Sequence, residues 1–501
     1  MSAAVALAVA TALAGCGTTT YFAGRTLPPS GLQNRVLIAI QNPSAASAGS
    51  LVFVDAYYDT RYAYNNINKT FSITGFGGSL PVSIQNMPEE QEGAVYSSGN
   101  GSLTPINYAK ESSNGPQAGL SGNTYSSIFM TRSGTYVFAT TTLSAGLVIV
   151  DGSSGGTAYQ LGLPGAYRVS VNSAGSVALV FVENSDYVYY PRKLTAAQTI
   201  SYAGGQSTWP LGAVDCEPRT APGWCLFQAL DPASTTSNII PLKFNRPIKA
   251  VFSPDGGTAY VLNCGPECGS TSGGPASVSL VPVAPMIFTV GQNSGQLPTN
   301  AALSKPCASA GSVNSCNIPV PAGASNALVA SSTMYVVGQH TLSDGFWGGY
   351  LTVVNLTSNT VVPTNSSSPN PVSISDGTPG GVSRMLLADD NTLWIGMTKC
   401  TAGERYNNPS QYPGGYGCLT MYNTSTGAVL VMPYTGDATG IAAVTGLHKI
   451  YTTQGGQVYI NSTVCSSTEC PAISNQYVTV TGTASDVAYM DADSDDDNTV
   501  Y

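Results

Sequence analysis

The chain has 501 residues, enough for one large β assembly or for two or three average domains. Only 9% of the residues are charged, the formal net charge is −9, and the sequence has no basic stripe, which argues against a nucleic-acid partner. Hydrophobic residues make up 43% of the chain, and β-branched and aromatic residues recur throughout, so the composition is not that of a disordered protein.

The first feature along the chain is a short apolar segment that ends near a cysteine. Residues 3–14 read AAVALAVATALA, which is long enough for a signal-peptide core and too short to span a bilayer. The sequence LAGC, ending at Cys16, resembles the lipobox of bacterial lipoproteins. That resemblance implies cleavage before Cys16, acylation of its thiol, and attachment to the cell envelope through the lipid alone. No Lys or Arg precedes the apolar run, and an ordinary secretory signal cleaved near Ala14 is the alternative.

After an expected tether over residues 16–35, one pattern repeats along the chain. The clearest copy, residues 248–263, reads IKAVFSPDGGTAYVLN: an apolar strand, a turn with Asp-Gly, and a second apolar strand. A third strand follows each copy, and often a fourth. Four short strands per unit predict the blades of a β-propeller, and no helical period of useful length competes with them. Further copies begin at residues 81, 126, 167, 325, 382 and 439.

These units resemble the YVTN-type and lactonase-like β-propeller repeats, best in SPDGGTAYVLN followed by ASVSLVPV. The resemblance covers most of the chain after about residue 35 and implies an all-β fold, a single propeller over residues 36–501, without indicating an activity. The first unit lacks its first strand, and the C-terminal TASDVAYMDADSDDDNTVY supplies one. We therefore predict that the two ends pair in one blade and close the ring. This count gives eight four-stranded blades, whereas seven is the commoner number in the family.

Apart from Cys16, the cysteines fall into close pairs. An even set at short spacings in an exported chain predicts disulfides. Zinc at Cys264 and Cys268 is the alternative, but the chain has only two histidines and no second pair at a suitable spacing. Several pairs lie in loop insertions expected at about 205–245, 284–323 and 400–418. The predicted disulfides are Cys216/Cys225, Cys264/Cys268, Cys307/Cys316, Cys400/Cys418 and Cys465/Cys470.

A candidate ligand site emerges when the units are aligned on their turn glycines. Arg168, Lys249 and Arg384 then share one position at the start of the innermost strand, and Asp486 takes it in the closing unit. Because innermost strands line the channel of a propeller, three cations there would form a partial ring for an anionic or sugar-like ligand. The alternative is that these side chains form salt bridges with neighbouring blades.

A candidate metal site lies in the acidic run DADSDDDN. Asp491, Asp493 and Asp495 have the spacing of a calcium loop, although the glutamate that completes an EF-hand is absent. The alternative is a solvated turn. A calcium ion here would be a structural cofactor that helps to lock the ring.

No catalytic motif stands out. The chain has no HExxH motif and no P-loop, and no catalytic residue can be assigned. We expect an exported, lipid-anchored propeller that acts as a non-enzymatic binding or scaffold protein at the cell envelope, with a protein or glycan partner and no nucleic acid. A lactonase-like hydrolase with a channel site and a self-assembling extracellular structural subunit are the alternatives. Trp209, Trp224 and Trp347 are expected in loops, where they would bind partners or pack insertions onto the blades.

Overall fold

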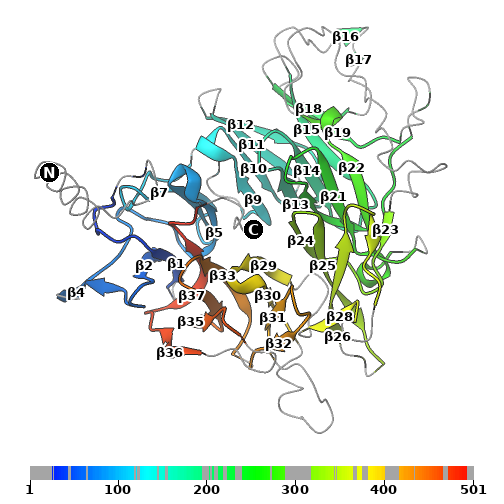
Figure 1. Cartoon of the computed structure of the whole chain (residues 1–501). Coiled ribbons are helices and arrows are strands. Elements are labelled where there is room, and N and C mark those ends of the chain that lie inside the picture. Colours follow the sequence, from blue (N-terminus) through cyan, green and yellow to red (C-terminus); the bar gives the residue numbers. More distant parts are fainter. Residues whose placement is uncertain are drawn as a thin grey trace, which may run out of the picture.

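The computed structural model describes residues 25–493 apart from residue 26 and internal gaps, the longest of which are 195–201, 208–212, 218–222, 232–237, 288–316, 375–381, 401–416 and 466–471. The described strands form an all-β propeller: eight antiparallel sheets stand as blades around one centre (Figure 1). The predicted propeller is confirmed, with eight blades rather than seven.

Blades 1 to 4 follow one another around the ring. Blade 1 contains β37 (Thr483–Tyr489), β1 (Arg35–Gln41) and β2 (Ser50–Asp55). Blade 2 contains β5 (Pro81–Met87), β6 (Glu92–Ser97), β7 (Ser102–Asn107) and β8 (Ser112–Ser113). Blade 3 contains β9 (Ser127–Met130), β10 (Tyr136–Thr140), β11 (Leu147–Asp151) and β12 (Thr157–Leu161). Blade 4 contains β13 (Ala166–Val171), β14 (Ala178–Val182), β15 (Val188–Leu194), β19 (Gly223–Gln228) and β18 (Ala213–Glu217).

Blades 5 to 8 complete the ring. Blade 5 contains β20 (Pro247–Phe252), β21 (Thr258–Asn263), β22 (Ser277–Pro282) and β23 (Asn317–Pro319). Blade 6 contains β24 (Asn326–Ala330), β25 (Thr333–Thr341), β26 (Trp347–Asn355), β27 (Thr360–Val361) and β28 (Val372–Ile374). Blade 7 contains β29 (Val382–Ala388), β30 (Thr392–Met397), β31 (Leu419–Asn423) and β32 (Val429–Val431). Blade 8 contains β33 (Ala438–Val444), β34 (Lys449–Gln454), β35 (Gln457–Ser462) and β36 (Ala472–Val478).

Two small hairpins and short 3-10 helices complete the described structure. The hairpins are β3 (Tyr62–Ala63) with β4 (Asn66–Thr70), and β16 (Tyr202–Ala203) with β17 (Gln206–Ser207). The helices are η1 (Pro88–Glu90), η2 (Arg132–Gly134), η4 (Gly265–Cys268), η5 (Ala284–Met286) and η7 (Asp389–Asn391). No helix in the described part of the chain has both the length and the apolar character needed to cross a membrane.

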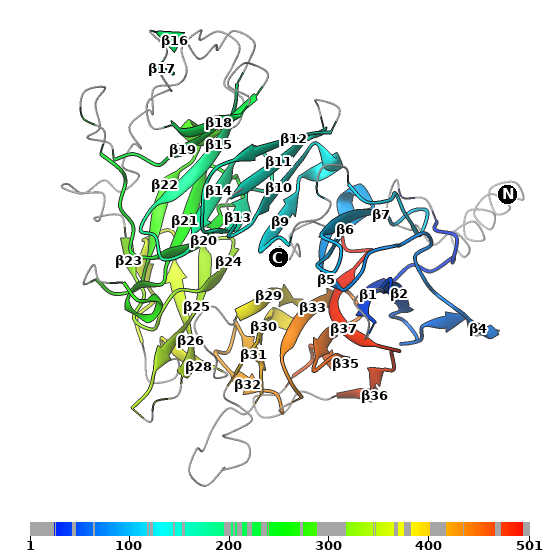
Figure 2. The ribbon, with the colours of Figure 1, turned by 180° about the vertical axis from the view of Figure 1, so that it is seen from behind.

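The hydrophobic core lies between blades, because each sheet buries its two faces against its neighbours. Between blades 2 and 3, Tyr96 and Tyr125 meet edge to face with ring centroids 6.3 Å apart. Between blades 1 and 2, Leu37 and Phe53 pack with Ile84. The innermost strands, among them β5, β13, β24 and β29, are seen from both sides to surround the centre (Figures 1 and 2).

The predicted closure by the two chain ends is confirmed. β37 from the C-terminal end is the innermost strand of blade 1 and pairs antiparallel with β1, with Leu37 opposite Ala488. β1 in turn pairs with β2, so the ring has no open edge at this point. Counting the described strands, blade 1 has three in its sheet, and blades 4 and 6 have five, which departs from the uniform four expected.

A buried ion network lies beside this closure. Both carboxylate oxygens of Asp491 accept hydrogen bonds from the Arg35 side chain, at 2.7 and 3.0 Å. Arg35 also donates to Glu111 Oε1 at 3.0 Å and to the carbonyl of Tyr108 at 2.7 Å. Glu111 is reached in addition by the amide of Ser30, so part of the expected tether packs against the ring. The network therefore ties β1 to the segment after β37 and to blade 2.

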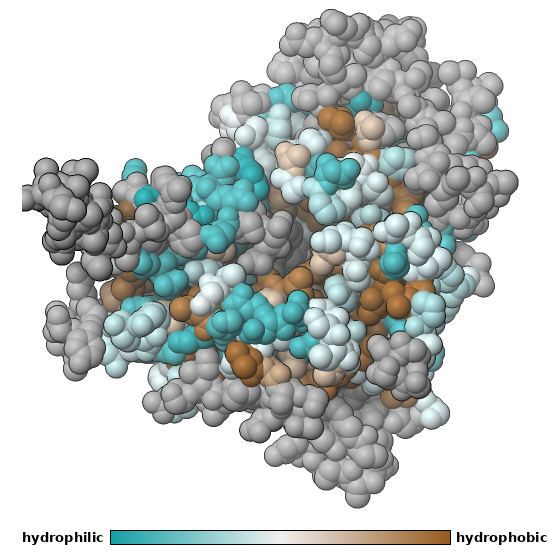
Figure 3. All heavy atoms as spheres, viewed as in Figure 1, coloured by the Kyte–Doolittle hydropathy of each residue, from teal (hydrophilic) through white to brown (hydrophobic). Residues whose placement is uncertain are grey.

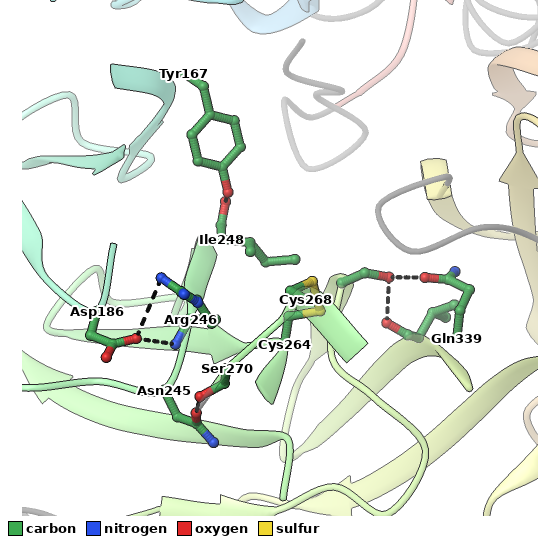
Figure 4. The surroundings of a disulfide bond; sticks show 11 residues. Tyr167, Asp186, Asn245, Arg246, Ile248, Cys264, Cys268, Ser270 and Gln339 are labelled. Carbon is green, nitrogen blue, oxygen red and sulfur yellow. Dashed lines mark hydrogen bonds and ion pairs between the residues drawn. A yellow bond between two sulfur atoms is a disulfide. The ribbon is translucent and has the colours of Figure 1, made fainter. Parts of the chain in front are cut away.

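Three of the predicted disulfides lie within the described residues. They are Cys216–Cys225, Cys264–Cys268 and Cys400–Cys418. Figure 4 shows Cys264–Cys268 in the loop after β21, near the contact of Arg246 with Asp186 from blade 4. Cys465 is also disulfide-bonded. Cys16, Cys307, Cys316 and Cys470 lie outside the described residues.

Reduction of the disulfides is expected to lower the melting temperature. The three described bonds close loops with sequence separations of 9, 4 and 18 residues, and loops of this size contribute about 2–3 kcal/mol each by restricting the unfolded chain. The measurement is thermal unfolding before and after reduction, with thiol alkylation to establish that every bond has opened. An unchanged melting temperature after full reduction would show that the bonds do not stabilise the fold.

Candidate functional site

The site is built on a shared irregularity of the innermost strands. In six of the eight blades, the register between the innermost strand and the second strand shifts by one residue near the start of the strand. A bulge of this kind bends the strand and redirects the side chain that follows. We call the residue after the shift the ring position. In the other two blades, Ser127 and Asn326 begin β9 and β24 at the equivalent place.

The ring positions carry an uneven distribution of charge. Arg168, Lys249 and Arg384 supply three cations, and Asp486 supplies one carboxylate, so the four residues predicted from the sequence do share one level of the ring. The remaining positions are polar or small. From blade 1 to blade 8 the ring positions are Asp486, Ser83, Ser127, Arg168, Lys249, Asn326, Arg384 and Gly440.

Arg384 and Asp486 form a buried salt bridge, with Nη2 2.6 Å from Oδ2. Asp486 also accepts the backbone amides of Ile84 at 2.8 Å and Val487 at 2.9 Å. Burial raises the pKa of Asp486, and Arg384 and the two amides oppose this effect only in part. For these two side chains, the structure agrees with the salt-bridge alternative stated from the sequence.

Gly440 makes this salt bridge possible. It occupies the ring position of blade 8, between the blades that carry Arg384 and Asp486. A Cβ atom at Gly440 would lie only 2.4 Å from Asp486 Oδ1 and 2.8 Å from Thr453 Oγ1. A glycine is therefore needed because the carboxylate occupies the space of a side chain.

Arg168 and Lys249 have a different environment. Both are partly exposed, and they occupy neighbouring ring positions. The Lys249 Nζ donates to Asn326 Oδ1 at 2.8 Å, and the Arg168 guanidinium lies 5.7 Å from the centre of the Tyr167 ring. Among the described residues, no carboxylate lies within ion-pair distance of either cation. The salt-bridge alternative therefore does not account for this pair.

The electrostatics of Lys249 reflect this excess of positive charge. Burial, together with the positive charges of Arg168 and Arg384, lowers the pKa of Lys249 to about 7. Next to it, the Tyr167 hydroxyl donates to the carbonyl oxygen of Ile248 at 3.2 Å (Figure 4), and burial raises the pKa of Tyr167 to about 12. This contact joins β13 to β20 and holds the two cationic positions side by side.

The surface is hollowed near the centre of the ring (Figure 3).

Two of the three candidate calcium residues, Asp491 and Asp493, lie within the described structure. Both carboxylate oxygens of Asp491 are bound by Arg35, and Asp493 is exposed. Asp495 lies outside the described residues, so calcium binding stays a prediction. The described residues contain no group of three or more His, Cys, Asp or Glu side chains placed to hold a metal ion.

The expectation that Trp224 lies in a loop is wrong. The residue belongs to β19 and is fully buried between blades, with its ring 5.3 Å from that of Tyr136. Its Nε1 donates to the buried Asp151, which also pairs with Lys193 at 2.7 Å. The expected insertion contributes strands to blade 4, because β19 pairs with β15 at the edge of the sheet. Trp347 was also expected in a loop and is instead the first residue of β26. Trp209 lies outside the described residues.

Comparisons with known proteins give likenesses of fold and no indication of function. No known family and no curated protein matches the sequence. Among similar solved structures, the dihydro-heme d1 dehydrogenase NirN in complex with DHE is 11% identical, with a TM-score of 0.42, and the match covers 92% of this chain and 75% of that one. The Dos1 propeller is 10% identical over 81% and 85% of the two chains, with a TM-score of 0.44. A putative 6-phosphogluconolactonase from Bacteroides fragilis is 9% identical over 91% and 97%, with a TM-score of 0.38. These are likenesses of fold alone.

Proposed function

We propose that this protein is an exported, lipid-anchored propeller that acts as a non-enzymatic binding protein at the cell envelope and holds a small anionic ligand at the centre of its ring. The observation that carries the binding site is the neighbouring pair Arg168 and Lys249, which meets no carboxylate among the described residues. Arg384 is matched by Asp486, so the other two cations remain to attract an anion. The fixed blades on either side hold both cations in place.

A carboxylate-bearing ligand, such as an acidic sugar of an envelope glycan, suits this site. Arg168 offers a planar guanidinium for the two carboxylate oxygens, and Lys249 adds a compact second charge when its amine is protonated. Asn326 presents an amide beside Lys249 that can bind a hydroxyl group as well. Support for the envelope location comes from the apolar leader with Cys16 and from the disulfides.

Replacing Arg168 or Lys249 by glutamine is expected to weaken binding of galacturonate more than tenfold, because each hydrogen bond to a charged group contributes about 1.5–3 kcal/mol. Isothermal titration of both variants against galacturonate, with galactose as the neutral probe, measures this effect. Lys243→Gln is the matched control, since its side chain is 60% exposed in the loop before β20. An equal loss in Lys243→Gln, or equal affinity for galactose, would assign binding to diffuse surface charge or to another site.

Replacing Cys16 by serine is expected to release the protein from the membrane fraction, because a serine hydroxyl cannot take the place of the acylated thiol. Cell fractionation and intact-mass analysis of the exported protein from a bacterial host measure this effect. The unmodified chain is the reference and should carry acyl mass on Cys16. An unchanged distribution, with no acyl mass on the unmodified chain, would favour an ordinary secretory signal.

A further inference from the structure

The amine of Lys249 is held in position by a hydrogen bond and has no carboxylate partner among the described residues. The bulge in β20 places it at the ring position, with part of its side chain exposed. Its Nζ contacts the amide oxygen of Asn326 at 2.8 Å, and that oxygen also accepts the amide of Ala327 at 2.9 Å. An amide oxygen orients the amine without supplying the negative charge that would hold a proton on it.

The groups around Lys249 favour the neutral amine. Arg168 on β13 and Arg384 on β29 both act on it as positive charges, and Asn326 on β24 is uncharged. Asp486 on β37 is bound to Arg384, so its charge is already compensated. With a pKa near 7, a large fraction of Lys249 is neutral at physiological pH. A lysine desolvated beside other cations is the arrangement that makes an amine nucleophilic.

We propose that Lys249 captures small anionic carbonyl compounds, such as aldehyde acids and 2-oxo acids, as an imine while Arg168 holds their carboxylate. This inference rests on the proposed anion site and adds a covalent step to it. The neighbouring ring positions of Arg168 and Lys249 bring a carboxylate-binding group and an amine to one side of the centre. That juxtaposition suits a ligand with a carbonyl carbon next to its carboxylate.

The step is balanced without a co-reactant. The lone pair of the neutral Lys249 Nζ forms a bond to the carbonyl carbon, and the carbonyl π electrons move to oxygen, which takes a proton. The resulting carbinolamine expels this hydroxyl as water, with protons transferred from nitrogen through solvent. A C=N bond to Lys249 remains, and hydrolysis reverses the sequence.

The test is reductive trapping with glyoxylate as the anionic aldehyde and propanal as the neutral one. The folded full-length protein is treated with each aldehyde and cyanoborohydride between pH 6 and 9, and the modified lysines are located by peptide mass spectrometry. We expect glyoxylate to modify Lys249 at least tenfold faster than Lys243, with the rate rising through pH 7 to a plateau. Arg168→Gln should remove the preference of Lys249 for glyoxylate over propanal.

Lys249→Arg should lose trapping at position 249, because an arginine cannot form the imine. Titration of the unmodified protein and of Arg168→Gln with galacturonate tests the proposed function separately from the trapping experiment. Galacturonate binding that depends on Arg168, combined with glyoxylate labelling spread over exposed lysines and absent from Lys249, would overturn the inference and leave the proposed function standing. If the unmodified protein neither binds galacturonate nor traps glyoxylate selectively at Lys249, both the proposed function and this inference are overturned.

Discussion

Replacing Arg35 by methionine is expected to destabilise the fold by about 3–5 kcal/mol, because removing one partner of a buried ion network leaves the other charges without compensation. Asp491 and Glu111 are both buried, and each accepts a hydrogen bond from the Arg35 side chain at 3.0 Å or less. The backbone carbonyl of Tyr108 would lose its contact with the guanidinium as well. The damage falls at the closure of the ring, where β1 meets β37.

Urea unfolding followed by tryptophan fluorescence measures this loss. Arg132→Gln is the matched control, because Arg132 forms an ion pair with Glu89 in which both side chains are about 40% exposed. Exposed pairs contribute about 0–1 kcal/mol, so the control should unfold close to the unmodified midpoint. Similar midpoints for Arg35→Met and the unmodified chain would mean that the network does not hold the ring closed.

Replacing Asp486 by alanine is also expected to cost about 3–5 kcal/mol, since Arg384 then loses its buried counter-ion. The amides of Ile84 and Val487 lose the same carboxylate, and Ile84 belongs to the next blade. Burial already raises the pKa of Asp486, which shows that the folded protein partly disfavours the charge. The salt bridge is thus costly to break from one side without being a large net source of stability.

The double variant Arg384→Met with Asp486→Leu tests this distinction. Removing both charges together is often neutral or stabilising for buried pairs, so the double variant should recover most of the stability that Asp486→Ala loses. The free energies of unfolding of the single and double variants form the comparison. A double variant that is less stable than Asp486→Ala would show that the salt bridge itself contributes the larger share.

The sequence predicted the blades well because their signal is local. Each unit brings its own strands and turn, and Gly256, in the turn between β20 and β21, has a φ of 68° that suits glycine. Ring closure followed from an unpaired strand at each end. The extra strands of blade 4 were not foreseen, because β18 and β19 lie within the expected insertion. β19 pairs with the edge strand β15, and β18 pairs with β19.

Alignment of the units selected residues that stand at ring positions, and it showed only part of their surroundings. Alignment of the units placed Arg168, Lys249 and Arg384 together at one position of the repeat. It could not show that Arg384 is matched by Asp486 across Gly440, because that contact joins blades 7 and 1. The register shifts also left no sequence signal. The role of Asp491 depends on Arg35, which is 456 residues away along the chain.

Because β1 pairs with β37, the first blade can be completed only late in synthesis of the chain. Synthesis runs from the N-terminus, so the apolar hairpin of β1 and β2 exists long before β37 is made. Throughout that interval one edge of β1, with the sequence RVLIAIQ, has no native partner and can pair with a neighbouring copy instead. Closure of the ring therefore waits for β37, and a chain interrupted before this strand is a candidate for aggregation.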